Sequence, residues 1–411
     1  MCRLVVVWLL TLPLLSARAD EDNSEDLWVF PRSNGIPLRD KDGKEVLRWN
    51  TAAKATWTDN ERVRLRLFRF PGPHEGYVLK TEVVKLADAE KYFSDKIRTN
   101  EKEAWAWRMR AQARSFNGEH DGAIEDLTRA IRLDPSSEGY SARGNALRMK
   151  GELEKAIRDY DEAIRLDPES GMAFNNRGSA WYVKKEFDKA IQDYSEAIRL
   201  DPNDTLALNN RAGAWHDKGD LDKAIQDYNE IIRIDSKYVF AFNNRGTVWY
   251  AKKEYDKAIA DYDEAIRLDP EYAHAHFNRG EARYAKGDYD EAIADFTKLI
   301  QLKPKDAIAY GYVAWLLSTC PEEKLRDGKR AVEMATKACE LTGWKDAGQL
   351  ATLAAAYAEA GDFENAIAYQ EKALKDDGYA KKEDAQALLN LYKLNLYKQK
   401  KPFRYAPLGK E

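Results

Sequence analysis

Residues 174–202 read FNNRGSAWYVKKEFDKAIQDYSEAIRLDP, and residues 242–270 read FNNRGTVWYAKKEYDKAIADYDEAIRLDP. The second stretch begins 68 residues after the first and nearly repeats it. Residues at the matching end position recur at steps of 33 or 34 along the chain, with serine replacing proline once: Pro135, Pro168, Pro202, Ser236, Pro270 and Pro304. A period of this length is typical of a unit made of two helices.

Small residues recur at one place in each half of the unit. The first half has Gly144, Gly178, Ala212, Gly246 and Gly280, and the second half has Ala156, Ala190, Ala224, Ala258 and Ala292. Because these residues lack bulk, the two helices of a unit can approach closely. A single helical hairpin cannot bury its own apolar face, so the sequence predicts hairpins that stack on their neighbours.

This pattern of a bulky residue, glycine, tyrosine, alanine, an aromatic residue, alanine and proline over 34 residues resembles the tetratricopeptide repeat. The resemblance covers residues 104–380 and implies a mainly α fold, a superhelix of helical hairpins or alpha solenoid. Eight units are predicted, at residues 104–136, 137–170, 171–204, 205–238, 239–272, 273–306, 307–346 and 347–380.

Some units depart from the family pattern. Unit one has Arg110 and Arg114 where the family usually has leucine and tyrosine, so it is a weak terminal unit. Unit seven carries extra residues around 321–328 between its helices. Where other units have a glycine after the first helix, units three and five have Lys185 and Lys253. We expect left-handed lysines there, each costing about 1 kcal/mol relative to glycine.

The end of the chain is predicted to close the array. Residues 384–398 read as a helix with Leu388, Leu391 and Tyr392 turned inward, and KKPFRYAPLGKE at 400–411 reads as a loose tail. Together, residues 381–411 form a capping helix and tail of the kind that repeat arrays require.

The first 19 residues have the features of a signal peptide. Arg3 precedes an apolar run of 12 residues at 4–15, and Ala17-Arg18-Ala19 precedes Asp20, the predicted mature start. The run is shorter than the 17 or so residues needed to cross a bilayer, so an uncleaved anchor is the less favoured alternative. We therefore expect an exported chain, periplasmic or secreted, with no integral membrane association after cleavage.

Residues 20–87 alternate short apolar runs with turns. A Lys-Asp-Gly turn lies within residues 27–49, ERVRLRLFRF alternates charged and apolar residues, and EGYVLKTEVVKL adds two short runs. Five or so strands in this length predict a small all-β barrel. The order of these runs resembles bacterial SH3-like domains. Residues 88–103 are expected to link the barrel to the repeats, with a helix, ADAEKYFSDKIRT, that packs against unit one.

Composition argues against several functions. The formal net charge is −4, and removal of a leader with two arginines makes it more negative, which disfavours nucleic-acid binding. No phosphate loop or nucleophile motif occurs, and the histidines are not at metal-ligand spacing: His74, His120, His216, His274 and His276. We expect no catalytic residue, metal or cofactor. The carboxylates of DKAIQDY and DEAIRLDP are expected on solvated faces, and Cys320 and Cys339 as buried free thiols.

The resemblance implies a binding site on the first helices, which line a concave groove in this family. Asn176, Asn210, Asn244 and Asn278 match the asparagine that often faces the groove, where an amide can bind the backbone of an extended peptide. The same predicted face carries Asn175, Asn209, Asn243, Tyr182, His216, Tyr250, Phe277, Glu281 and Tyr284. The alternative is that the asparagines only link adjacent helices and the tyrosines only pack. Trp181, Trp215 and Trp249 are assigned to packing between helices.

The sequence therefore predicts an exported, non-enzymatic scaffold that binds a protein or peptide. The alternative is a protein associated with the cell wall, in which the SH3-like domain binds peptidoglycan and the repeats serve as a spacer. These two hypotheses differ in what the residues before the repeats bind.

Overall fold

The computed structural model describes residues 83–376 and 393–405, and six short strands ahead of them. The chain divides into an N-terminal unit, Val7–Asp227, and a C-terminal unit, Tyr228–Glu411 with Met1–Val6, and we describe each by itself. The boundary falls within helix α9 (Leu221–Ile234).

Seven described strands of the N-terminal unit form one antiparallel sheet in the order β3-β2-β6-β5-β4-β1-β7. Their bounds are β1 Leu27–Pro31, β2 Ile36–Arg39, β3 Glu45–Trp49, β4 Ala53–Trp57, β5 Arg62–Leu67, β6 His74–Leu79 and β7 Val83–Lys85. Strands β2 and β3 pair with each other, and the Lys-Asp-Gly stretch that separates them in the sequence lies outside the described residues. The closed barrel and the SH3-like resemblance stay predictions, as does the signal peptide, which lies outside the described residues.

Helix α1 (Leu86–Thr99) follows β7 directly and packs on α2 (Ala104–Phe116). Phe93 of α1 is fully buried, and its ring meets the edge of Trp105 with centroids 5.6 Å apart. In this way α1 covers the apolar side of the first hairpin.

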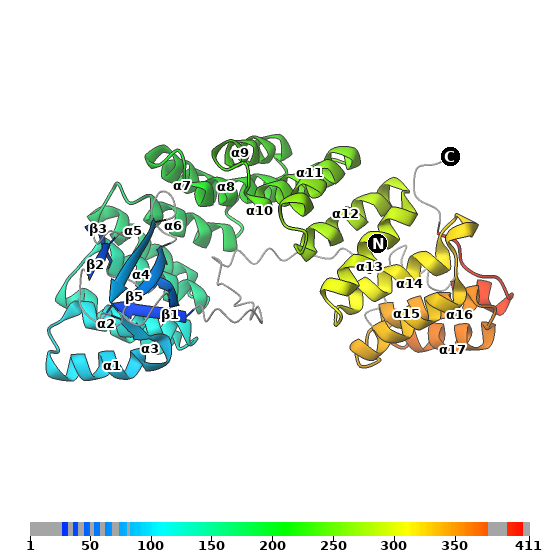
Figure 1. The fold of residues 1–411 in the computed structure, drawn as a ribbon, viewed down its shortest axis with the longest axis horizontal. Coiled ribbons are helices and arrows are strands. Elements are labelled where there is room, and N and C mark those ends of the chain that lie inside the picture. The colour runs from blue at the N-terminus through cyan, green and yellow to red at the C-terminus, as the bar shows by residue number, and fades with distance from the viewer. Residues whose placement is uncertain are drawn as a thin grey trace. The chain divides into compact units, whose positions relative to one another are not determined.

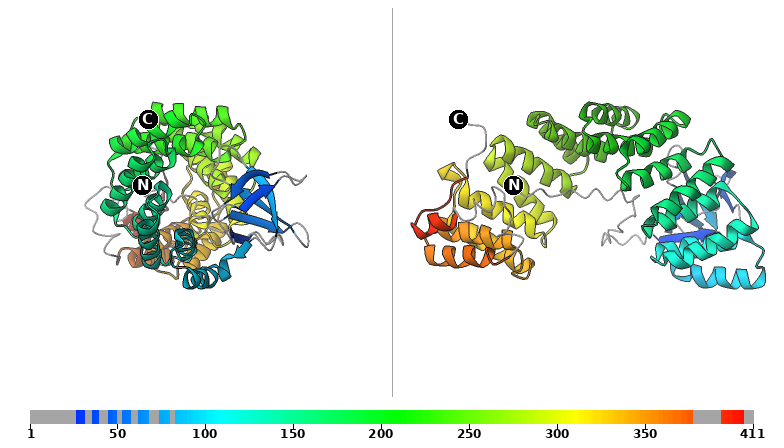
Figure 2. Two further views of the ribbon diagram at one scale, coloured as in Figure 1. Left: turned by 90° about the vertical axis from the view of Figure 1, so that its left-hand side faces the viewer. Right: turned by 180° about the vertical axis from the view of Figure 1, so that it is seen from behind.

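The described residues hold eight helical hairpins, one for each predicted unit (Figure 1). Within the N-terminal unit, and likewise within the C-terminal unit, consecutive hairpins lie side by side in the views of Figure 2 and share contacts. The pairs are α2 with α3 (His120–Leu133), α4 (Ser137–Met149) with α5 (Leu153–Leu166), α6 (Gly171–Val183) with α7 (Phe187–Leu200), α8 (Thr205–Lys218) with α9, α10 (Val239–Ala251) with α11 (Tyr255–Leu268), α12 (Ala273–Lys286) with α13 (Tyr289–Leu302), α14 (Ala307–Thr319) with α15 (Gly328–Leu341) and α16 (Ala347–Glu359) with α17 (Phe363–Ala373).

The small residues do hold the two helices of a hairpin together. A β-carbon added at Gly178 would lie 2.8 Å from the ring of Tyr194, and one at Gly246 would lie 2.7 Å from the ring of Tyr262. Both tyrosines are almost completely buried, so little room exists for the ring to move. The predicted close approach of the helices is confirmed.

The residue that ends each first helix is left-handed in seven of the hairpins. Glycine takes this conformation at Gly118, Gly151, Gly219, Gly287 and Gly361, and unit seven, with its extra residues, uses none. Lys185 and Lys253 both have φ of 62°. The two left-handed lysines predicted from the sequence are therefore confirmed.

The extra residues of unit seven form a short connection between α14 and α15. It contains the 3-10 turn η2 (Glu323–Leu325), and Asp327 then caps α15 by accepting a hydrogen bond from Arg330 N. Cys320, directly after α14, and Cys339, within α15, are buried free thiols, as expected. Burial raises the pKa of Cys339 to about 11, so this thiol stays protonated.

The C-terminal tail differs from the expected loose segment. Residues 393–398 are helical, while the rest of the predicted capping helix, with Leu388, Leu391 and Tyr392, lies outside the described residues. Beyond it, Phe403 is only 7% exposed and belongs to an apolar cluster with Ala354 and Ala358 of α16. The prediction of a loose tail is wrong for residues 401–405, because this segment contains aromatic side chains that pack on the last repeats.

Candidate functional site

Six of the repeats contain a buried ion pair between their two helices. An arginine of the first helix binds both carboxylate oxygens of an aspartate 16 residues later on the second helix. The pairs are Arg110–Asp126, Arg143–Asp159, Arg177–Asp193, Arg211–Asp227, Arg245–Asp261 and Arg279–Asp295.

These pairs correct the prediction that the carboxylates of DKAIQDY lie on solvated faces. Asp188, the first aspartate of that stretch, is exposed, but Asp193 is only 5% exposed. In a helix, two residues five apart point in different directions, so one stretch holds both kinds of aspartate. The signal that could have revealed the pair is the constant spacing of 16 residues between arginine and aspartate.

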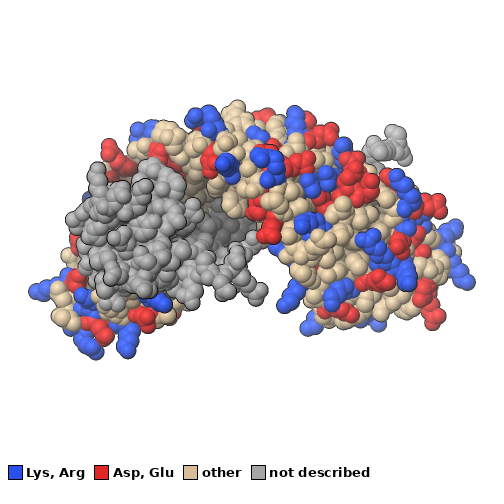
Figure 3. Space-filling model, in the orientation of Figure 1, with Lys and Arg blue, Asp and Glu red and all other residues tan. Residues whose placement is uncertain are grey.

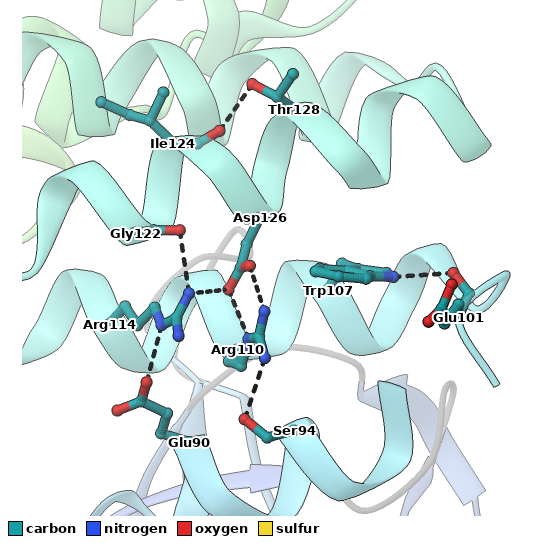
Figure 4. A network of polar contacts seen from close by, with 10 residues as sticks. All are labelled: Glu90, Ser94, Glu101, Trp107, Arg110, Arg114, Gly122, Ile124, Asp126 and Thr128. Carbon is teal, nitrogen blue, oxygen red and sulfur yellow. Dashed lines mark hydrogen bonds and ion pairs between the residues drawn. The ribbon is translucent and has the colours of Figure 1, made fainter. Parts of the chain in front are cut away.

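Each of these arginines also contacts the preceding helix. Arg177 Nη1 donates to Asp161 of the previous repeat at 2.7 Å, and Arg211 Nη1 donates to Ser195 at 3.0 Å. In the first repeat, Arg110 Nη1 donates to Ser94 of α1 at 3.1 Å (Figure 4). Helix α1 therefore takes the place that the second helix of a preceding repeat occupies elsewhere.

Burial and pairing act in opposite directions on these groups. Burial raises the pKa of Asp193, while the hydrogen bonds and charge of Arg177 lower it. The hydrogen bonds that the Arg177 guanidinium donates to Asp193 in turn raise the pKa of that guanidinium. The arginine is therefore charged at any physiological pH, and the pair is a structural clamp with bidentate geometry.

The predicted asparagines bond to one another between consecutive first helices. In the N-terminal unit, Asn210 Nδ2 donates to Asn175 Oδ1 at 2.9 Å. In the C-terminal unit, Asn278 Nδ2 donates to Asn243 Oδ1 at 2.9 Å, and Asn243 Nδ2 donates to Asn244 Oδ1 at 3.2 Å. We call the surface where consecutive first helices meet the first-helix face of each unit.

Five of the asparagines expose little area on this face. Their exposed fractions lie between 4% and 6%: Asn175, Asn176, Asn210, Asn243 and Asn244. Asn209 and Asn278 are half-buried. The amides therefore serve the packing of helix on helix, which the sequence left open as an alternative, and a peptide role for them stays a prediction.

In the N-terminal unit, the half-buried groups of the first-helix face surround a carboxylate. The Tyr182 hydroxyl of α6 donates to Asp217 of α8, and His216 Nδ1 lies 3.0 Å from the other oxygen of Asp217. Burial acts to raise the pKa of Asp217, but the hydrogen bonds from His216 and Tyr182 hold it below its usual value. This arrangement offers a carboxylate and two aromatic rings to a ligand.

In the C-terminal unit, the predicted groove residues form an aromatic cluster. The Tyr312 hydroxyl donates to Glu281 at 2.7 Å, and Trp315 Nε1 donates to the Tyr284 hydroxyl at 3.2 Å. The ring of Phe277 meets that of Tyr312 edge on, with centroids 5.7 Å apart. Chain residues beyond the repeats also reach this cluster, because Tyr405 stacks on Tyr284 with centroids 5.3 Å apart.

Burial is the main cause of the raised pKa values of Tyr250 and Glu281 in this cluster. It raises the pKa of Tyr250 to about 12, with smaller contributions from Glu281, Tyr255 and Tyr405. Burial also raises the pKa of Glu281, against the hydrogen bond from Tyr312. Burial raises the pKa of Tyr284 as well, so Tyr250 and Tyr284 both stay protonated over the physiological range.

The three tryptophans pack between helices, as predicted, and Trp181 and Trp215 also pack against residues of the preceding repeat. Trp181, for example, packs against the clusters around Tyr160 and Tyr194. Two lysine ammonium groups lie over each indole, and those of Lys184 and Lys189 are 5.5 and 4.5 Å from the Trp181 centroid. An ammonium group in this position is attracted electrostatically to the face of the indole ring.

The surface of the described repeats mixes both signs of charge. On the side drawn in Figure 3, lysines and arginines alternate with aspartates and glutamates over the repeats. Among the described residues, no group of three or more potential metal ligands comes together, and no helix has the length and apolar character needed to span a membrane.

Comparison with known families agrees with this architecture. A family model described as tetratricopeptide repeat matches residues 108–168, 141–205, 187–239 and 243–307, and a second with the same description matches residues 350–375. Together they cover more than half of the chain. The chain belongs to the tetratricopeptide repeat family. Such repeats typically build non-catalytic scaffolds that bind protein or peptide partners.

Solved tetratricopeptide proteins resemble parts of the chain, whereas no curated protein matches it. MamA is 27% identical over 40% of this chain and 96% of its own, with a TM-score of 0.37. YrrB, a TPR protein with an unusual peptide-binding site, is 25% identical over 44% of this chain and 95% of its own, with a TM-score of 0.38. A tetratricopeptide repeat protein from Parabacteroides merdae is 20% identical over 64% of this chain and 98% of its own, with a TM-score of 0.42.

Proposed function

We propose that the chain is a non-catalytic scaffold that binds an extended segment of a partner protein on its first-helix faces. The observation that carries this proposal is the set of half-buried aromatic and polar groups on that face. In the N-terminal unit, Tyr182 and His216 are held in place around Asp217. A surface of rigid aromatic rings beside a fixed carboxylate is suited to a peptide that supplies backbone donors and a basic or polar side chain.

Site-specific crosslinking tests this proposal. A photoreactive phenylalanine analogue in place of Tyr182 should yield discrete adducts with partner proteins in the producing cell. Asp188 lies on α7, the second helix of the same repeat, and its side chain is 82% exposed, so the same analogue at Asp188 is the matched control. Adducts at position 182 that disappear with His216→Ala support the proposal. Equal adducts at positions 182 and 188 would contradict it.

Export is a further part of the proposal, supported by the leader-like residues 1–19. Sequencing the N-terminus of the protein isolated from its native compartment should give Asp20 as the first residue. A chain that retains Met1 would refute cleavage. Sedimentation of the whole protein with purified peptidoglycan tests the alternative of wall attachment, which predicts that the protein pellets with the wall.

A further inference from the structure

The tail segment Lys401–Tyr405 lies on the first helices of the last three repeats, α12, α14 and α16. We propose that this surface is a binding site for partner peptides that carry an aromatic residue, an arginine and a second aromatic residue in sequence. The chain's own tail fills it until such a peptide displaces the tail. The proposal rests on the peptide-binding role above and adds a partner chemistry and a competitor.

The chain directs its tail onto this surface by a defined helix end. Lys400 is left-handed, with φ of 58°. Its amide donates to the Tyr397 carbonyl at 2.9 Å, and the amide of Lys401 donates to the Leu396 carbonyl at 2.9 Å. This pair of bonds closes a Schellman motif, and Pro402 prevents the helix from continuing. The tail therefore leaves the helix in one fixed direction.

The surface offers the Thr319 carbonyl at the end of α14 as a backbone acceptor for the tail. That helix ends at Thr319, shortly before Pro321, so the last carbonyls need donors from outside the helix. Asp327 N, in the extra loop of unit seven, donates to the Leu317 carbonyl at 2.9 Å. Tyr405 N donates to the Thr319 carbonyl, also at 2.9 Å. An extended peptide with an amide at this point satisfies the helix end without regard to its side chain.

Two aromatic side chains of the tail occupy apolar positions on the surface. Phe403 is 7% exposed, and its ring centroid lies 5.8 Å from that of Trp315 in α14. Tyr405 stacks on Tyr284 of α12 with an angle of 29° between the rings. Each contact places a flat ring against a ring that the scaffold already holds, because Trp315 donates to the Tyr284 hydroxyl. These two positions select aromatic residues.

The arginine between them meets a buried carboxylate. Arg404 Nη1 lies 2.6 Å from Glu359 Oε2 at the end of α16. The other oxygen, Oε1, lies 3.0 Å from Arg326 Nε, and the Glu359 side chain is only 12% exposed. A carboxylate held on one side by a fixed guanidinium presents its second oxygen at a defined place, which favours a planar cation such as arginine.

The same geometry makes the tail exchangeable. When Arg404 leaves, Glu359 keeps its ion pair with Arg326, so no buried carboxylate is stranded. The Arg404 side chain already exposes 36% of its area in the docked tail, so part of it is in water before release. A tethered segment acts at an effective concentration on the order of millimolar, so a partner peptide must bind more tightly than the tail or arrive in excess.

A labelled peptide of the sequence KKPFRY, residues 400–405, tests the proposal by fluorescence anisotropy with the full chain. The variant Phe403→Ala/Arg404→Ala/Tyr405→Ala keeps the whole chain but removes the competing side chains. It should bind the peptide with a Kd at least about tenfold lower than the wild type does. A peptide with arginine replaced by alanine, KKPFAY, should bind at least about tenfold more weakly than KKPFRY.

If circular dichroism shows that the triple variant does not fold, a single substitution provides the same test. Arg404→Ala alone leaves both tail aromatic residues in place and should still bind KKPFRY more tightly than the wild type. Adding Glu359→Gln should remove the preference for KKPFRY over KKPFAY. For the folded variants that keep Glu359, failure to bind KKPFRY, or equal binding of KKPFRY and KKPFAY, would overturn the proposal.

The crosslinking experiment and the peptide-binding experiment test the scaffold role and the tail site separately. Crosslinking at position 182 in the N-terminal unit reports on the scaffold role and does not involve the tail site. Adducts there without any binding of KKPFRY would refute the tail site alone. A wild-type chain that dimerises by exchange of tails, seen by sedimentation as dimers that Arg404→Ala abolishes, would overturn the assignment of the tail to its own chain.

Discussion

At the scale of single residues, the arginine and aspartate clamps join each hairpin internally and to its predecessor. Arg177 holds Asp193 of its own repeat and Asp161 of the previous one. The two-way bond explains why this pair recurs while most surface charges vary. The pair is difficult to recognise in a sequence rich in both charges. Aspartates at adjacent turns look alike in the sequence, although one is exposed and the other is buried.

Removal of the buried partner should therefore destabilise the protein. Asp193→Ala leaves the Arg177 guanidinium without its bidentate partner and is expected to cost about 2 to 4 kcal/mol in the free energy of unfolding. The control Glu162→Ala removes the partner of Arg165 in an exposed pair and should cost less than about 1 kcal/mol. Urea unfolding followed by circular dichroism measures both. Equal effects would show that the buried pair does not stabilise the array.

The left-handed lysines make a second prediction at this scale. Lys185→Gly and Lys253→Gly remove the steric cost of φ near 62° and should each raise the free energy of unfolding by up to about 1 kcal/mol. Gly219→Lys is the reverse change in a unit that uses glycine, and it should lower the stability by a similar amount. A loss of stability in the lysine-to-glycine variants would mean that these side chains make contacts that outweigh the strain.

At the scale of elements, the helix at 393–398 places a lysine in an apolar setting. Lys393 is 4% exposed, and its ammonium lies 4.6 Å from the Trp315 centroid and 5.0 Å from that of Phe403. Burial lowers its pKa from 10.5 to about 8. The Lys393 ammonium therefore links its helix to the Phe403 ring of the tail and to the Trp315 ring of α14.

This burial predicts a pH dependence with a definite sign. Between pH 8 and 10.5 the unfolded chain holds a proton on Lys393 that the folded chain has lost, so the stability rises with pH in this window and falls as the pH drops through 8. The difference in unfolding free energy between the wild type and Lys393→Met should shift with that sign in urea titrations at pH 7.5 and 10. Lys398→Met, which removes an exposed lysine of the same helix, is the matched control. A constant difference for Lys393→Met would contradict the account.

The sequence predicted the elements well and the contacts between them less well. Periodic small residues and prolines placed all eight hairpins, and the positions of Lys185 and Lys253 predicted left-handed turns, because these features depend on local sterics. The docking of Phe403 and Tyr405 depends on rings contributed by distant helices. No local pattern carries that information.

The candidate binding residues show the same division. The resemblance assigned Asn210 and Asn278 to the groove face of the first helices and left bonding between adjacent helices as the alternative. In the structure each bonds an asparagine of the neighbouring first helix. A resemblance transfers a position, whereas burial and the available partner decide what the side chain does there. Tyr284, also predicted, is held by Trp315 and stacks against Tyr405 of the tail.

At the scale of the whole molecule, each unit is a run of hairpins whose first helices leave polar and aromatic groups partly exposed. Within the C-terminal unit, residues 401–405 lie on that face and are held by one backbone bond, two rings and one arginine. We propose that a partner segment binds there in the same way.

Hydrogen exchange at the tail, measured by mass spectrometry on the wild-type chain, tests this central claim most directly. The Tyr405 amide bonds the Thr319 carbonyl, so it should exchange more slowly than in an unstructured peptide of the same sequence. An excess of free KKPFRY should speed its exchange by displacing the tail, whereas KKPFAY should have little effect. Exchange at the unprotected rate in the wild type, without added peptide, would contradict the account.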